Sequence, residues 1–319
     1  MDLRQLRYFL QIAEAGSFSR AAELLHVAQP SLSQHIINLE EELGVPLLIR
    51  HPRGVTPTDF GHLLSEHART ILRDVERSRH SMLNAGENPS GEVTVGLPTS
   101  ACRGLSVPLI AAAARQYPSI SIHIVEAMTG SLEEWVQAGR IDVALLYDRR
   151  AFENLEMNDV MTEELRLIVQ AAHPLAAARA VTFREASTLP LVLPATPNVI
   201  RSLVDRHAIR SDLELNIALN CDSLAAITEL VHAGHATLYP SFPMSREIER
   251  GEFVAIPVVD PTPKWDLSVV LSKKTSNVRA ASAAAQLVGE VARNLVRCGK
   301  WDAQLRRTAR ERPGLSTLT

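Results

Sequence analysis

Residues 17–43 read SFSRAAELLHVAQPSLSQHIINLEEEL, and this stretch decides the fold of the first part of the chain. Ser17 is a good N-cap for a helix that carries Ala21 and Ala22, whose small side chains let two helices cross closely. The short connection HVAQ leads to another helix, which we expect to begin near Pro30 because proline suits the first helical turn. The stretch therefore predicts two short helices in close contact.

The helix near Pro30 has two faces of different character. Apolar residues recur at helical spacing on one of them: Leu32, Ile36, Leu39 and Leu43. Short or uncharged side chains occupy the first turns of the other: Ser33, Gln34, Ile37 and Asn38. A helix-turn-helix needs this asymmetry, because one face packs on the preceding helices while the first turns of the other enter the major groove. Ser31 and Gln34 also have the spacing of a capping box.

The flanking segments complete a compact unit. A first helix carries an apolar stripe that includes Leu6 and Phe9, and Gly16 ends it. After Gly44 come a short apolar strand and a turn with cationic side chains: Arg50, His51 and Arg53. We expect this turn to be a wing that places its cations on backbone phosphate or in the adjacent minor groove.

Charge gives little support to nucleic-acid binding. The whole chain has 33 Lys plus Arg against 36 Asp plus Glu, a net charge of −3, and residues 1–58 hold five basic residues against six acidic ones. By charge alone that segment is a solvated helical bundle, although a small reading head can belong to a large neutral chain. The prediction of DNA binding therefore rests on the order of the motifs.

Composition argues against several other classes of protein. With 46% apolar and 22% charged residues the chain is globular, and no segment reaches the ~18 apolar residues of a membrane span, so we expect a cytoplasmic protein. Cys102, Cys221 and Cys298 lie far apart without a C-x-x-C pair, which argues against a disulfide framework or a zinc cluster. Familiar catalytic motifs such as G-x-S-x-G and H-E-x-x-H are missing, so we expect neither an enzyme nor a cofactor.

The segment AGENPSG at 85–91 is a breaker that divides the chain. Before it, residues 59–88 predict one linker helix with an approximate three-four stripe: Phe60, Leu64, His67, Ile71, Val75, Ser78 and Met82. This stripe predicts dimerisation, and the alternative is that it packs only on its own chain. After the breaker, strands and helices alternate over 89–300, which implies a parallel sheet covered on both faces. A polar tail at 301–319 follows.

Doubly wound sheets bind ligands outside the carboxyl ends of their strands, at helix N-termini. The predicted junctions of this kind contain the following candidates for effector binding: Thr99, Ser100, Thr129, Gly130, Thr196, Asn198 and Asp222. Hydroxyls together with free backbone N–H groups suit a small carboxylate, so an organic anion is the expected ligand. The alternative is ordinary N-capping, which would explain Ser131 and Asp222.

The stretch LRYFLQIAEAGSFSRAAELLHVAQPSLSQHIINLEEELGVPLLIRHPRGVTPTDFG at 6–61 closely resembles the N-terminal signature of LysR-type transcriptional regulators. GLPTSACRGLSVPLI at 96–110 is similar to their nitrogen-assimilation-control-like branch. The resemblance implies an all-α winged helix-turn-helix at 1–58, a dimerising linker helix, and a two-lobed α/β effector domain like the periplasmic binding proteins. Lobe I would cover about 91–160 and 266–297, and lobe II about 161–265.

The same resemblance assigns residues to DNA. Positions that face DNA in the family correspond to Gln29, Pro30, Ser31, Ser33 and Gln34, and the wing positions correspond to Arg50 and Arg53. Asn38 lies on the same helix face, and we expect it to contact DNA as well. Many relatives have arginine where this chain has Gln34, and glutamine pairs with adenine whereas arginine favours guanine, so the base preference stays open.

The leading hypothesis is a regulator that binds an interrupted inverted repeat as a dimer of dimers and responds to a small molecule. Its expected partners are operator DNA, further copies of itself and RNA polymerase. One alternative is a solute-binding module without DNA control. The other is a redox sensor through Cys102 and Cys221, which would need an exposed thiol of low pKa.

Overall fold

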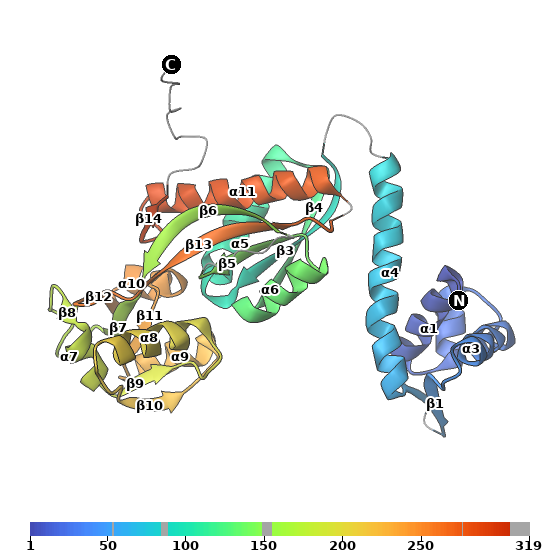
Figure 1. Ribbon diagram of the computed structural model, residues 1–319, viewed down its shortest axis with the longest axis horizontal. Coiled ribbons are helices and arrows are strands. Elements are labelled where there is room, and N and C mark those ends of the chain that lie inside the picture. The colour runs from blue at the N-terminus through green and yellow to red at the C-terminus, as the bar shows by residue number, and fades with distance from the viewer. Residues whose placement is uncertain (53, 84–88, 149–154, 276, 307–319) are drawn as a thin grey trace, which may run out of the picture. The chain divides into compact units, whose positions relative to one another are not determined.

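A computed structural model describes residues 1–52, 54–83, 89–148, 155–275 and 277–306 (Figure 1). The chain divides into two compact units, Met1–Ala85 and Gly86–Thr319. The first unit is helical with one small hairpin: α1 (Leu3–Ala15), α2 (Phe18–Leu25), α3 (Gln29–Leu43), β1 (Leu48–His51), β2 (Gly54–Pro57) and α4 (Asp59–Leu83).

The ends of the first helices follow the predicted local chemistry. Gly16 ends α1 in the left-handed conformation, with φ of 63°. The Ser17 hydroxyl accepts a hydrogen bond from the Arg20 backbone N–H and caps α2, which confirms the predicted cap. The predicted capping box in α3 is wrong, because α3 begins at Gln29 after Ala28 and has no side-chain cap. Ser31 therefore already lies inside the helix.

The core of the first unit joins all its helices. Side chains without exposure include Phe9, Ile12, Ala21, Leu32, Ile36, Leu39 and Ala68. The predicted stripe of α3 is confirmed at three of its four positions; Leu43 is 38% exposed, because α3 ends there and the chain turns away at Gly44.

The wing hairpin packs against the end of α1. The Val55 backbone N–H donates to the Gly16 carbonyl at 2.9 Å, and a Cβ at Gly54 would lie 2.4 Å from that same oxygen. Gly54 has φ of 137°, which side chains disfavour. Glycine is therefore required here both by conformation and by the close approach of the two backbones.

The predicted stripe on α4 divides between two environments. Leu64 and Ile71 pack on the core of their own unit, as the own-chain alternative expects. Phe60 is 52% exposed and His67 is also exposed, so the core of the first unit does not cover these two side chains. The side chains of Ser78 and Met82 lie outside the described residues.

The second unit contains two lobes. Lobe I holds a six-stranded sheet in the order β14-β6-β13-β5-β3-β4, with bounds β3 (Gly91–Pro98), β4 (Ile120–Ala127), β5 (Val143–Tyr147), β6 (Leu155–Glu164), β13 (Lys264–Ser272) and β14 (Ala303–Leu305). Its helices are α5 (Thr99–Gln116), α6 (Thr129–Ala138) and α11 (Val278–Arg297). Helices α5 and α11 cover one face of the sheet and α6 covers the other (Figure 1).

Lobe II is built on a four-stranded sheet, β11-β7-β12-β8, and a parallel pair, β9 and β10. Its strands are β7 (Arg166–Gln170), β8 (Val181–Thr182), β9 (Leu191–Leu193), β10 (Ile217–Asn220), β11 (Thr237–Tyr239) and β12 (Phe253–Val259). Its helices are α7 (Phe183–Thr188), α8 (Val199–Arg210), α9 (Leu224–His232), the 3-10 turn η1 (Phe242–Met244) and α10 (Ser245–Glu249).

The prediction of a parallel sheet is wrong, because both lobes contain mixed sheets. In lobe I, β3 pairs in parallel with β4 and β5, but β13 is antiparallel to both β5 and β6. The sheet of lobe I is mixed because the chain crosses to lobe II and then returns. Strand β6 carries the chain into lobe II and β13 brings it back, so the two strands run in opposite directions side by side (Figure 1). Residues 161–164 and 264–265, which were predicted to lie in lobe II, therefore belong to the lobe I sheet.

The predicted polar tail at 301–319 is wrong for its first residues. Trp301 is only 1% exposed, and β14 pairs with β6 in the lobe I sheet. The Trp301 indole donates to the Glu163 carboxylate at 2.6 Å, and the Trp265 indole donates to the other oxygen at 2.9 Å. Two indole donors thus anchor the C-terminal segment beneath the crossing strands. Residues 307–319 lie outside the described residues.

We expect the stability of the second unit to fall as pH rises through neutrality. Burial raises the pKa of Glu163 from 4.5 to about 7, and this effect outweighs the two indole hydrogen bonds that lower it. The folded carboxyl therefore binds more protons than the unfolded one between these values. The free energy of unfolding should decline by on the order of 3 kcal/mol between about pH 4.5 and pH 8.

Urea unfolding followed by tryptophan fluorescence measures this, because Trp135, Trp265 and Trp301 all lie in the second unit. Glu163→Gln should flatten the dependence in that window, whereas Glu156→Gln, an exposed change on the same strand, should leave it unaltered. An unchanged pH profile in Glu163→Gln would contradict the assignment.

Candidate functional site

The first turns of α3 form an open polar surface. Gln29, Pro30, Ser31, Gln34 and Asn38 are exposed, and Ser33 is half-buried between them. The predicted exposure of this surface is therefore confirmed within the first unit. Its free helix N-terminus adds backbone N–H groups that attract phosphate.

Two amide side chains on this surface are oriented by each other. The Gln34 side-chain nitrogen Nε2 donates to Asn38 Oδ1 at 2.8 Å. This bond directs the Gln34 Oε1 acceptor and the Asn38 Nδ2 donor outward. An adjacent acceptor and donor match the N6 amino group and N7 of adenine in the major groove.

Arg50 connects the β1–β2 hairpin, which is the predicted wing, to the same surface. Its guanidinium donates to the Ser33 hydroxyl at 3.1 Å, and its Cζ lies 4.5 Å from the centre of the Phe18 ring. Arg50 therefore joins β1 to both α2 and α3, and its remaining N–H donors stay at the surface. The predicted wing cation Arg53 lies outside the described residues.

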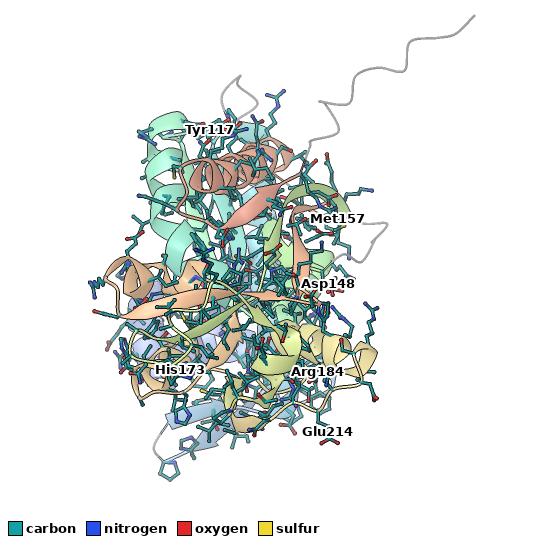
Figure 2. The ribbon with its side chains drawn as sticks, turned by 90° about the vertical axis from the view of Figure 1, so that its left-hand side faces the viewer. Tyr117, Asp148, Met157, His173, Arg184 and Glu214 are labelled. Carbon is teal, nitrogen blue, oxygen red and sulfur yellow. The ribbon has the colours of Figure 1, made fainter. Side chains whose placement is uncertain are left out.

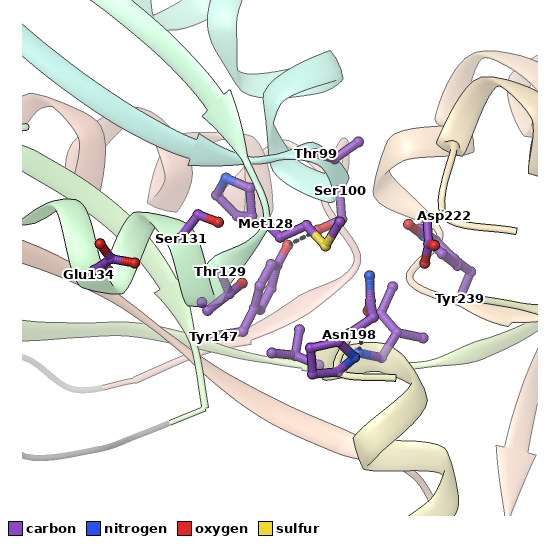
Figure 3. A pocket seen from close by; sticks show the side chains of 15 residues that line it. Thr99, Ser100, Met128, Thr129, Ser131, Glu134, Tyr147, Asn198, Asp222 and Tyr239 are labelled. Carbon is purple, nitrogen blue, oxygen red and sulfur yellow. Dashed lines mark hydrogen bonds between the residues drawn. The ribbon is translucent and has the colours of Figure 1, made fainter. Parts of the chain in front are cut away.

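In the second unit a cavity of about 270 Å³ lies between the lobes (Figure 3). Lobe I lines it with Pro98, Thr99, Ser100, Met128, Thr129, Gly130, Ser131, Glu134 and Tyr147, and lobe II with Pro197, Asn198, Val199, Ile200, Asp222 and Tyr239. The structure thus brings together six of the seven predicted effector residues. Thr196 is the exception among the described residues: it is exposed, and its neighbour Pro197 lines the cavity instead.

Sequence reasoning missed the two tyrosines of the cavity. Tyr147 ends β5 and Tyr239 ends β11, so both stand at carboxyl ends of strands, where ligand sites are expected. In the sequence both tyrosines stand within apolar runs, which are typical of a core. The Ser100 hydroxyl donates to the Tyr147 hydroxyl at 2.6 Å, and burial raises the pKa of both phenols, so both are neutral hydrogen-bonding groups.

The N-capping alternative is wrong at both positions where it was expected. Ser131 lies inside α6, whose N-cap is Met128 and has no side-chain hydrogen bond. Asp222 does not cap α9, since Ser223 does; one Asp222 oxygen instead accepts from the Ala195 N–H at 3.0 Å. Asn198, in contrast, caps α8 through its Oδ1 and turns its amide nitrogen into the cavity (Figure 3).

Two ion pairs cross from lobe I to lobe II. The Arg206 guanidinium lies 2.7 Å from the Asp148 carboxylate. In Figure 2, Asp148 lies below Tyr117 and Met157 and above His173, Arg184 and Glu214. Arg103 on α5 lies 2.5 Å from Glu247 and also donates to the Pro243 carbonyl at 2.9 Å. The arrangement of the lobes is therefore held by paired charges on either side of the cavity.

The remaining candidate chemistry is weak. Burial raises the pKa of the Cys102 thiol, which reduces its thiolate fraction and weighs against redox sensing. Within the described ranges no group of three His, Cys, Asp or Glu side chains is arranged to hold a metal ion. None of the described helices is long and apolar enough to cross a membrane.

Comparison with known proteins identifies both units. Residues 3–62 match the model for bacterial regulatory helix-turn-helix proteins of the lysR family, and residues 86–293 match the LysR substrate binding domain. The chain belongs to the LysR family. As a LysR-type protein it is a DNA-binding transcriptional regulator with an effector-binding domain.

Individual LysR relatives cover most of the chain. The nitrogen assimilation regulatory protein nac of Klebsiella aerogenes is 34% identical over 75% of this chain and 78% of its own length. The dual regulator OxyR of Escherichia coli is 30% identical over 85% of this chain and 89% of its own. The structure of CbnR complexed with its target DNA has a TM-score of 0.72 at 24% identity, covering 90% of this chain and all of that one, which supports the fold.

Replacing Gln34 tests whether this surface contacts bases. We expect Gln34→Arg to move the preferred base from adenine to guanine at one position in each half-site, by about tenfold in relative affinity. Selection from randomised duplexes measures this preference. The control Glu41→Gln raises the net charge by one, as Gln34→Arg does, at an exposed position farther along α3. It should leave the preferred bases unaltered. Identical preferences in Gln34→Arg and the unsubstituted protein would exclude base contact by this side chain.

Proposed function

We propose that this regulator binds an interrupted inverted repeat in duplex DNA as a dimer of dimers, and that a small molecule in the inter-lobe cavity controls this binding. The observation that carries the proposal is the open surface of α3, where Gln34 and Asn38 present base-reading groups beside Arg50. The arrangement suits insertion of the first helical turns into the major groove, with the wing on the backbone.

Assembly is supported by the exposed apolar residues on α4. Phe60 and Leu63 are 52% and 54% exposed, and a second copy of the helix would cover them. Two heads on a two-fold axis read two half-sites, which a single head cannot do. The DNA complex of the structurally similar CbnR is consistent with such a target. A regulator that binds DNA and recruits RNA polymerase would work in the cytoplasm of a bacterial cell.

Control by a small molecule follows from the position of the cavity. Both lobes line it, so a ligand that contacts both favours one arrangement of the lobes over others. Since binding and conformation are linked, the ligand must change DNA affinity by the same factor as DNA changes ligand affinity. A solute-binding module without DNA control would show no such coupling.

Salt dependence of DNA binding tests the first part of this proposal. The logarithm of affinity should fall linearly with the logarithm of salt concentration, and Arg50→Ala should weaken binding by roughly tenfold for all sequences while reducing the slope by about one. Fluorescence anisotropy with a labelled operator duplex measures both quantities.

Arg184→Ala is the matched control, because it removes one exposed cation from lobe II and should change neither affinity nor slope. Affinity that is independent of salt, or equal losses in Arg50→Ala and Arg184→Ala, would count against the DNA-binding surface.

A further inference from the structure

The described residues that line the inter-lobe cavity include two carboxylates and no cation. Among its described lining residues, Glu134 and Asp222 are the only ones that carry charge at neutral pH, and they belong to opposite lobes. We infer that the effector is a small zwitterion of amino-acid type, which carries an ammonium group as well as a carboxylate. This inference rests on the proposed effector function of the cavity and corrects the expectation of a plain organic anion.

The hydroxyls of two largely buried residues favour a polar ligand in the cavity. Thr129 is 5% exposed and Tyr239 is 4% exposed, and both line the cavity. Neither side chain has a hydrogen-bond partner among the residues that the structure describes. A ligand that bonds to both hydroxyls would gain two hydrogen bonds that an apolar ligand cannot form.

Lobe I provides the groups for a carboxylate. Helices α5 and α6 both begin at the cavity, after Pro98 and Met128, and neither has a side-chain cap on its first N–H groups. Two uncapped N-termini of helices with 18 and 10 residues therefore offer backbone donors and positive dipole ends to one anionic group. The Asn198 amide nitrogen approaches from lobe II (Figure 3).

Lobe II provides the main partner for an ammonium group. One Asp222 oxygen is held by the Ala195 N–H, and the other accepts no hydrogen bond from the described residues. Its charge faces the cavity without a protein counterion. Glu134 adds a second carboxylate at the lobe I side. An ammonium group on the ligand would neutralise this site and donate charge-assisted hydrogen bonds to it.

The neighbouring arginines already have acceptors within the protein. Arg206 is paired with Asp148, and Arg103 with Glu247. Arg201 bonds to Asp205 at 2.9 Å and to the Asn220 side chain at 2.9 Å. Each cation near the cavity is thus already engaged by protein acceptors. A dicarboxylate would bring unbalanced negative charge beside two carboxylates, which costs binding free energy.

The position of the cavity fits the same class. Its volume is about 270 Å³, and it shares six lining residues, Thr129 and Tyr147 among them, with an adjoining space of about 570 Å³. A zwitterion bound between the helix ends of lobe I and Asp222 of lobe II would contact both lobes at once. Charge recognition and lobe closure would therefore depend on the same ligand groups.

Ligand screening of the full-length protein tests the inference. The twenty standard amino acids are compared by thermal shift and calorimetry with the matching carboxylic acids that lack the amino group and the amines that lack the carboxylate. At least one amino acid should bind, and its two truncated analogues should bind roughly tenfold or more weakly. Asp222→Asn should reduce amino-acid affinity by a similar factor. Asp212→Asn, an exposed lobe II carboxylate outside the cavity, should have no effect.

Equal affinity of an amino acid and its deaminated acid, stronger binding of plain dicarboxylates, or no binding by any compound in the panel would overturn the inference. Operator binding by the same preparation is measured separately. Loss of operator binding with retained amino-acid binding would refute the proposed regulator while supporting the zwitterion site. Retained operator binding together with a preference for dicarboxylates would support the proposed regulator and refute the zwitterion site.

Discussion

The antiparallel pairing of β6 and β13 is the constraint on which the second unit depends. These strands join the two lobes, and their paired register runs from Leu155 opposite Ser272 to Glu164 opposite Lys264. Glu163 stands at the end of this pair and accepts both indole N–H groups. Trp265 in turn packs on Tyr147, with ring centres 4.1 Å apart, so the wall of the ligand cavity rests on the same strands. The cavity lies between the lobes because the chain crosses between them here.

The charges around the cavity divide into two kinds. Arginines are engaged in pairs that hold the lobes or brace lobe II, whereas Asp222 and Glu134 face the ligand space. Since pairing removes each arginine as a ligand partner, the nominal charge of the surrounding chain is a poor guide to what binds. Ligand chemistry depends on which groups remain unpaired after folding, and these are carboxylates, hydroxyls and helix N–H groups.

In the first unit, too, the chemistry of the surface depends on how a few side chains are placed and not on net charge. Residues 1–58 have almost no excess charge, yet α3 presents neutral hydrogen-bonding groups at its first turns. Arg50 contacts Ser33 and Phe18, so the wing cation lies against both α3 and α2. Under the proposed function, sequence selectivity would come from the positioned amide groups and affinity from a small number of cations.

The sequence by itself determined the features that depend on neighbouring residues. The stops and caps at Gly16 and Ser17, the open face of α3, and six of the fifteen cavity residues were predictable, because helix spacing, capping chemistry and strand ends are local. Only the tertiary structure decided the mixed sheets, the burial of Trp301 and the exposure of Tyr239 to a ligand space. Pairing between β6 and β13 joins residues about a hundred positions apart, and Arg103 pairs with Glu247, 144 positions away. No local pattern encodes such contacts, since they form only when the two lobes fold around a shared pair of strands.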